Sequence, residues 1–141
     1  MKFRYSSHSS NLKKIYFRVI NHITILVKDR LKAAEFYSDI LGLEIIEKGK
    51  HRWIKIDDQY IHLAQNSGLP TKNSFAHFCI TVDDLPTFIK KLIAKNIQVF
   101  DFDDNMSKTD INTNLDKKIR LFFIHDIDGN LIELTDTNND F

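Results

Sequence analysis

The stretch Asn21-His22-Ile23-Thr24-Ile25-Leu26-Val27 decides the fold, because it is matched later by Ala76-His77-Phe78-Cys79-Ile80-Thr81-Val82. In both stretches a histidine opens a run of β-branched and apolar residues, a composition typical of a strand. Each run is followed by a charged turn and then by the apolar spacing of a helix. A pattern that repeats along a chain indicates a duplicated structural unit, so we predict two copies of one module.

The predicted helices cover residues 31–41 and 85–95, each with its apolar residues on one face. An aspartate near the start of each helix, Asp29 or Asp84, can accept hydrogen bonds from free backbone N–H groups. Gly42 follows the first helix and suits the left-handed conformation that ends many helices.

Short strands complete a β-α-β-β-β order in each copy. In the first copy we expect strands at residues 15–27, 43–47, 52–56 and 59–64, and in the second at 76–82, 97–102, 119–124 and 130–135. The polar stretch 103–116 makes the second copy longer, and we expect it to be a loop insertion that leaves the strands in place. The expected fold is therefore α+β, with tandem βαβββ modules at residues 20–65 and 75–136.

Length and composition predict one domain, residues 15–141, in a chain of 141 residues. A hydrophobic content of 43% with only 4 glycines and 2 prolines is enough to bury a core. A net charge of +1 favours neither nucleic acid nor an acidic membrane as a partner. No apolar run approaches the roughly 18 residues needed to cross a bilayer.

The N-terminal residues 1–14 are polar and rich in serine, so we expect a flexible extension rather than a secretory signal. Cys79 is the only cysteine, which excludes a disulfide within the chain and fits a reducing compartment. We therefore expect a cytoplasmic protein.

Four polar side chains interrupt the apolar strands at matched positions of the repeat: His22, His62, His77 and Glu133. If two like modules pack about a pseudo-twofold axis, matched positions converge, and the four side chains would meet in one cavity. Imidazole nitrogens and a carboxylate oxygen suit one divalent ion, which could be Zn²⁺, Ni²⁺, Co²⁺, Fe²⁺ or Mn²⁺. The alternative is a polar pocket that holds no ion.

Within this set, His22, His77 and Glu133 alone form a two-histidine, one-carboxylate group that leaves coordination positions open for a substrate. Glu133 is the candidate catalytic residue, because it could act as a base. We predict that Cys79 is unreactive and that Trp53, Phe122 and Phe123 belong to the core or the pocket wall. The sequence names no substrate-binding residues.

The chain resembles the vicinal oxygen chelate superfamily, which includes glyoxalase I, fosfomycin-resistance proteins, methylmalonyl-CoA epimerase, extradiol dioxygenases and bleomycin-resistance proteins. The motifs that carry the resemblance lie in residues 20–136: Asn21-His22-Ile23, Val27-Lys28-Asp29, Glu35-Phe36-Tyr37, Leu41-Gly42-Leu43, Ala76-His77-Phe78, Val82-Asp83-Asp84-Leu85 and Asp126-Ile127-Asp128-Gly129-Asn130-Leu131-Ile132-Glu133-Leu134.

This resemblance implies a U-shaped sheet around one metal ion, with His22, His77 and Glu133 at the usual ligand positions. It also implies a homodimer whose site lies within one chain or across two chains that exchange modules. His62 departs from the glutamate or glutamine found at its position in glyoxalase I and the epimerase. A neutral ligand there would leave the ion with more positive charge.

The leading activity implied is that of a metal-dependent lyase or isomerase of the lactoylglutathione lyase type. A small oxygenated substrate would be chelated through vicinal oxygens while Glu133 moves a proton. The alternatives are a fosfomycin-type transferase, an Fe²⁺ extradiol dioxygenase, and a non-catalytic protein that binds a drug or metabolite.

Overall fold

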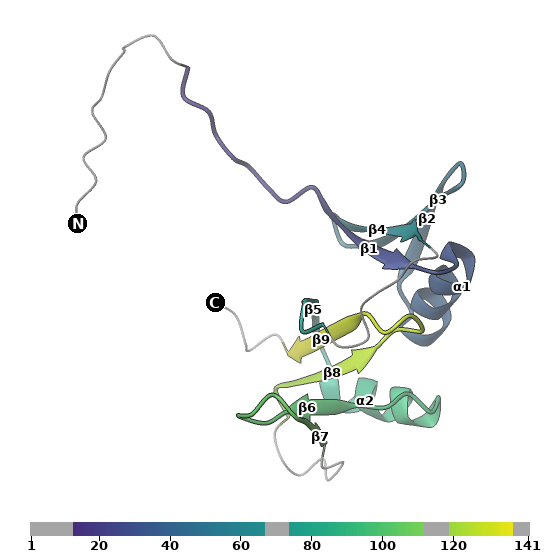
Figure 1. Cartoon of the computed structure of the whole chain (residues 1–141), viewed down its shortest axis with the longest axis vertical. Coiled ribbons are helices and arrows are strands. Elements are labelled where there is room, and N and C mark those ends of the chain that lie inside the picture. The colour runs from purple at the N-terminus through teal and green to yellow at the C-terminus, as the bar shows by residue number, and fades with distance from the viewer. Residues whose placement is uncertain (1–12, 67–73, 112–118, 137–141) are drawn as a thin grey trace, which may run out of the picture.

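The structure is a computed structural model that describes residues 13–66, 74–111 and 119–136. Module one contains β1 (His22–Val27), helix α1 (Arg30–Glu35), the π-helical turn η1 (Phe36–Ile40), β2 (Glu44–Lys48), β3 (His51–Ile56) and β4 (Gln59–Gln65) (Figure 1). Module two contains β5 (His77–Val82), α2 (Leu85–Ala94), β6 (Phe100–Phe102), β7 (Lys108–Asp110), β8 (Leu121–His125) and β9 (Leu131–Asp136). The predicted α+β fold of two consecutive modules is confirmed.

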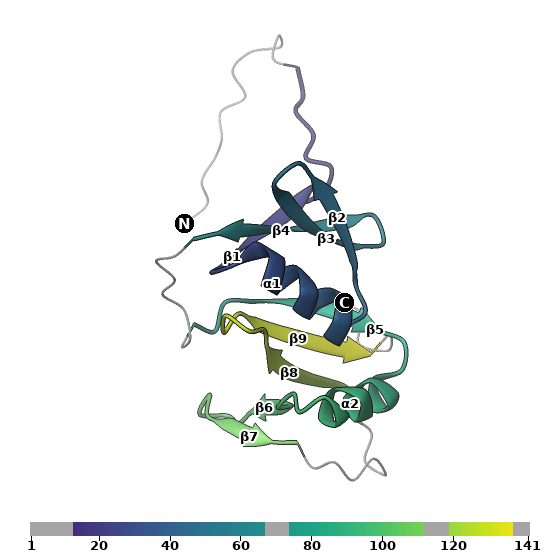
Figure 2. The ribbon, with the colours of Figure 1, turned by 90° about the vertical axis from the view of Figure 1, so that its right-hand side faces the viewer.

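Each module forms its own mixed sheet (Figure 2). Sheet A has the order β1-β4-β3-β2 and sheet B the order β5-β9-β8-β6-β7. The first strand of each module pairs in parallel with the last, β1 with β4 and β5 with β9, and the other pairs are antiparallel. β1 and β5, which begin at His22 and His77, are thus equivalent edge strands of their sheets.

The predicted helix boundaries depend on capping side chains that the structure contains. The carboxylate of Asp29 accepts hydrogen bonds from the backbone N–H groups of Leu31 and Lys32, and Asp84 accepts one from Thr87. Gly42 has a φ of +72°, the left-handed conformation expected at the end of the first helix. The second half of that helix is a π-helical turn, which residue spacing alone did not distinguish from an α-helix.

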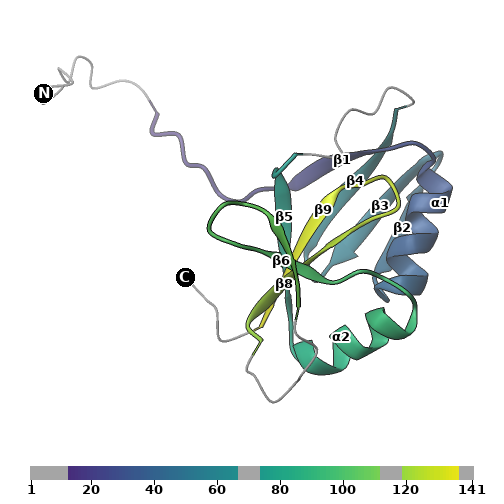
Figure 3. The ribbon, with the colours of Figure 1, turned by 60° about the horizontal axis from the view of Figure 1, so that its bottom comes forward.

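Two expectations about the strands are wrong. Residues 15–21 were expected to belong to the first strand, but β1 begins at His22 and residues 13–21 extend away from both sheets (Figure 3). They have the composition of a strand, but none of the strands in the described residues pairs with them. The polar stretch 103–116 contains the strand β7, because Asp103 accepts hydrogen bonds from the N–H groups of Asn105 and Ser107 and turns the chain back onto β6. Most of the predicted extension, residues 1–12, lies outside the described residues.

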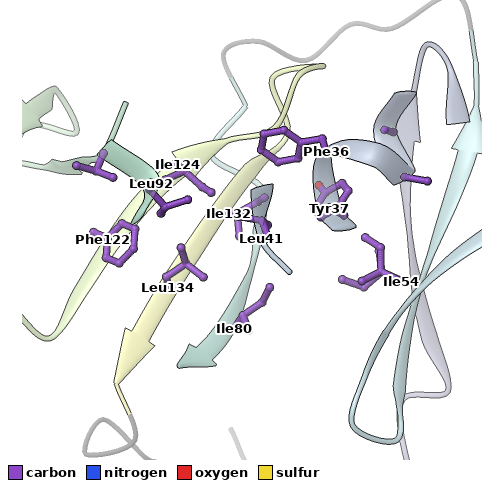
Figure 4. Packing of buried hydrophobic residues seen from close by; sticks show 14 of the residues in the cluster. Phe36, Tyr37, Leu41, Ile54, Ile80, Leu92, Phe122, Ile124, Ile132 and Leu134 are labelled. Atoms are coloured by element: carbon purple, nitrogen blue, oxygen red, sulfur yellow. The ribbon is translucent and has the colours of Figure 1, made fainter. Parts of the chain in front are cut away.

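The two modules share one hydrophobic core. Ile54 on β3 and Ile132 on β9 both face this core, and Tyr37 of η1 lies between them (Figure 4). Alternate residues of a strand face opposite sides of its sheet, so each sheet has one face in this common core and one face outside it. We call the second face of each sheet its open face.

A buried hydrogen bond joins the modules within this core. The hydroxyl of Tyr37 donates to Oδ2 of Asp126 over 2.8 Å. Asp126 also accepts hydrogen bonds from the backbone N–H groups of Asp128 and Asn130, and the Asn130 amide donates to the carbonyl of Leu26 on β1. Burial, followed by the charge of Asp126, raises the pKa of Tyr37 well above its ordinary value, so Tyr37 stays a hydrogen-bond donor.

Replacing Tyr37 by phenylalanine should lower the free energy of unfolding by about 1–3 kcal/mol, because it removes a donor from a buried carboxylate. Urea denaturation followed by circular dichroism measures this loss. Tyr60→Phe, on the open face of sheet A, is the matched control and should cost less. An unchanged stability of Tyr37→Phe would mean that the hydrogen bond does not hold the modules together.

Candidate metal centre

The first half of the candidate site lies on the open face of sheet A. Cross-strand pairs place Thr24 opposite His62 and Trp53 opposite His62, so His22, His62 and Trp53 share this face. The Trp53 indole stacks on the His62 ring with centroids 4.3 Å apart, and the His22 ring meets Trp53 edge-on at 5.1 Å. Trp53 therefore fixes both imidazoles relative to each other, which goes beyond the pocket-wall role predicted for it.

The nitrogen atoms of these two histidines are arranged for binding. Nδ1 of His22 lies 2.8 Å from Oδ1 of Asn21, which can only accept, so Nδ1 donates and the neutral ring keeps a lone pair on Nε2. Nε2 of His62 is buried and has no hydrogen-bond partner among the described residues. Burial is the main cause that lowers the pKa of His62, and the nearby His51 and His22 lower it further. The lowered pKa of His62 favours the neutral form that a metal ion requires.

The second half of the site lies on the open face of sheet B. His77 Nδ1 is 2.7 Å from the carbonyl oxygen of Phe75, so Nδ1 is a donor. His77 Nε2 then faces Oε2 of Glu133 at 2.9 Å. In a neutral histidine with this tautomer, Nε2 is an acceptor, as is the carboxylate. Two acceptors at this distance need a cation between them, either a proton or a metal ion.

Aromatic rings surround this pair. Phe123 lies opposite Glu133 in the sheet and meets the His77 ring edge-on at 5.4 Å. The centre of the Phe75 ring lies 4.9 Å from the centre of the His77 ring and 5.2 Å from that of Phe102. We call Phe75, Phe100, Phe102 and Phe123 the aromatic patch. It borders the pair with apolar surface, which strengthens any charge interaction made there.

A second polar pair lies at the far side of the aromatic patch, which the sequence did not reveal. Lys108 Nζ is 3.4 Å from Nδ1 of His125 and 4.6 Å from the centre of the Phe100 ring. Burial lowers the pKa of His125, and the charge of Lys108 lowers it further. The two residues are 17 positions apart in the sequence and meet only because β7 pairs with β6. The sequence analysis treated the segment that contains β7 as a loop and therefore did not predict this contact.

One chain does not bring the four predicted ligands together. His22 lies with His62, and His77 lies with Glu133, but the described residues contain no group of three or more His, Cys, Asp or Glu side chains placed to hold a metal ion. The shared core explains this separation, because the two open faces lie on the sides of their sheets that face away from it. The assignment of the four residues as ligands stays a prediction.

Cys79 shares the open face of sheet B with Glu133. Burial, followed by the charge of Glu133, raises the pKa of its thiol to about 11. The thiol is therefore protonated at neutral pH, which agrees with the prediction that Cys79 is unreactive.

Comparisons with known proteins identify the family. The chain matches the Glyoxalase/Bleomycin resistance protein/Dioxygenase superfamily over residues 19–134 and belongs to it. It is 33% identical over 69 residues to the metallothiol transferases FosB of Staphylococcus epidermidis and Staphylococcus haemolyticus, a match that covers 46% of this chain. The chain spans about half the length of these curated relatives, 50% of each.

Solved structures share the fold. A glyoxalase family protein from Bacillus anthracis superposes with a TM-score of 0.65 at 24% identity, covering 88% of this chain and 98% of that one. The fosfomycin resistance protein FosX from Listeria monocytogenes, in complex with Mn(II) and sulfate, gives a TM-score of 0.63 at 17% identity, covering 86% and 91%. None of the helices in the described parts of this chain has the length and apolar character of a membrane span.

Lys108→Gln should raise the pKa of His125 toward the ordinary value of about 6.5, because it removes a neighbouring positive charge. Because the pKa of His125 is lower in the folded protein than in the unfolded chain, the free energy of unfolding keeps its full value above about pH 6.5 and decreases as the pH falls below that value. The variant should therefore lose less stability on acidification than the parent. NMR titration of the His125 ring measures the shift, with Lys48→Gln as the control; an equal pKa in all three proteins would contradict the contact.

Proposed function

We propose that this chain is a metal-dependent enzyme that acts on a small oxygenated molecule, with one divalent ion held by His77 and Glu133 together with His22 and His62. The observation that carries the proposal is the pair formed by His77 Nε2 and Glu133 Oε2, 2.9 Å apart. Two ligands that each lie about 2.1 Å from one ion at a right angle are about 3 Å apart, so this spacing suits a shared ion. Histidine ligands also usually donate their other ring N–H to a carbonyl or carboxylate, as His77 Nδ1 does to Phe75.

We further propose that two copies of the chain complete the site. Each open face carries half of the predicted ligands, and the common core keeps the two halves of one chain apart. A second copy can bring its His22 and His62 against the His77 and Glu133 of the first. A twofold dimer built in this way would contain two equivalent sites.

The bound ion would supply positive charge that polarises substrate oxygens. The residues of the chain would do the rest. The aromatic patch would exclude water beside Glu133, whose carboxylate is the group able to accept a proton from the substrate. His62, stacked on Trp53, would give a fixed neutral donor atom on the other side of the site.

Two reactions fit this arrangement. Thiol transfer to a small oxygenated electrophile is favoured by the likeness to the metallothiol transferases, and the unreactive Cys79 means that the thiol would come from a second substrate. Isomerisation of the lactoylglutathione lyase type is favoured by the position of Glu133 beside an imidazole, where it can move a proton between carbons. A common metal site would serve either reaction.

Adding Zn²⁺, Mn²⁺, Ni²⁺, Co²⁺ or Fe²⁺ to metal-free protein should raise its melting temperature for at least one ion. The gain is about 2.7 kcal/mol when the free ion is at 100 times its dissociation constant. His77→Gln and Glu133→Gln should lose this gain, because each removes a ligand. His125→Gln, on the same sheet face, is the control and should keep it. A parent protein that gains no stability from any of the five ions would exclude the proposed metal site.

Glu133→Gln should lower kcat by about 100-fold or more in whichever reaction the protein catalyses, because the variant loses both a general base and a proposed metal ligand. The measurement pairs a thiol-transfer assay on fosfomycin with a hemithioacetal isomerase assay, each across the same ions. Activity in neither assay, in a protein that binds metal with the expected ligands, would exclude both reactions and leave the metal site intact.

A further inference from the structure

The segment directly before β1 exposes an unusual amount of apolar surface. Residues 13–20, which we call the arm, contain five large hydrophobic residues that are all exposed: Ile15, Tyr16, Phe17, Val19 and Ile20. The side chain of Phe17 is 100% exposed. Contiguous apolar surface of this kind marks a contact with another molecule, since monomeric proteins rarely leave it in water.

We propose that the arm packs across the aromatic patch of a second copy of this chain, whose own arm packs on the first copy in return. Phe75, at the edge of the patch, offers the apolar surface for this contact, because it is 47% exposed and its ring lies edge-on to the ring of the partly buried Phe102. Phe100 and Phe123 are buried, so the arm would contact the patch at this edge. Both contact surfaces belong to every chain, so the exchange is self-complementary and closes as a twofold dimer.

Charge also matches the arm to this surface. The arm carries Lys13, Lys14 and Arg18 and no acidic residue. The β6–β7 hairpin that borders the aromatic patch carries four aspartates and one lysine: Asp101, Asp103, Asp104, Asp110 and Lys108. Opposite charges on two contacting surfaces select the partner and its orientation.

The direction of the arm favours a second copy over its own chain. The arm leaves module one at the start of β1 and extends away from the sheets, while the β6–β7 hairpin lies at the opposite end of the molecule (Figures 1 and 2). Eight extended residues reach at most about 29 Å. A second copy can present its hairpin and aromatic patch directly to the arm.

The arm also lies next to the proposed metal ligands. Ile20 is two residues before His22, and Phe75, which would receive the arm, is two residues before His77 and contacts its ring at 4.9 Å. An arm docked on Phe75 of a second copy therefore brings His22 toward the His77 of that copy. This last step rests on the proposed function; the contact between arm and patch does not.

Sedimentation equilibrium of the full chain in EDTA tests the contact without any metal. We expect a dimer for the parent protein and at least a tenfold weaker dimer for Phe17→Asp, since a buried aromatic anchor usually contributes more than the roughly 1.4 kcal/mol that a tenfold change represents. Because the Phe17 side chain is fully exposed, the variant should keep its thermal stability apart from the loss of dimer. Leu31→Asp is the matched control. Leu31 is 53% exposed on the surface of α1, away from the arm, so this variant should stay dimeric.

A charge exchange tests the surface that receives the arm. Arg18→Glu and Asp104→Lys should each weaken the dimer, and an equimolar mixture of the two variants should form mixed dimers more tightly than either forms alone with itself. Phe75→Ala should weaken the dimer from the receiving side, which separates the aromatic patch from any other docking place.

A monomeric parent protein would overturn the proposal, including one that binds acidic lipid vesicles through its arm. A dimer that Phe17→Asp leaves unchanged would overturn it as well. The metal-binding measurements decide the proposed function separately: a dimer that depends on the arm but binds no ion would keep this contact and exclude the metal site.

Discussion

The constraint on which the structure depends is that both sheets bury one face in the same core. The apolar residues of β1, β3 and β4 in module one and of β5, β8 and β9 in module two meet around the first helix, which leaves each sheet one face outside this core. Because strand side chains alternate, every histidine that interrupts an apolar strand is directed away from the core. The same burial that stabilises the chain therefore divides its candidate ligands between two surfaces.

Much of the fold was predictable because its signals are local. The caps at Asp29 and Asp84 and the left-handed Gly42 are chosen by backbone geometry within a few residues, and the structure has all three as expected. The strand β7 was not predictable from its polar composition, because the hydrogen bonds of Asp103 and pairing to β6 create it. Residues 15–21 show the opposite case, in which strand composition without a pairing partner gives no strand.

The candidate site was predictable in its parts but not in its assembly. The alternation of side chains along each strand puts His22 and His62 on one face of sheet A, and His77 and Glu133 on one face of sheet B. That all four meet at one ion stays a prediction. Whether His22 and His62 meet His77 and Glu133 depends on how the two modules pack. That packing is set by contacts between residues far apart in the sequence, such as the hydrogen bond from Tyr37 to Asp126. The stacking of Trp53 on His62 depends on cross-strand register, and the contact of Lys108 with His125 depends on an unforeseen strand.

The carboxylate of Asp126 has a consequence for how the duplicated chain folds. It accepts hydrogen bonds from the first module through Tyr37 and from its own loop through Asp128 and Asn130, and Asn130 reaches back to β1. Opening either module would strand this carboxylate without partners in an apolar interior, which is costly. The sequence therefore repeats one module twice, but the two modules unfold together as one cooperative unit. The chain should melt in one transition, and a protease should not release one module in folded form.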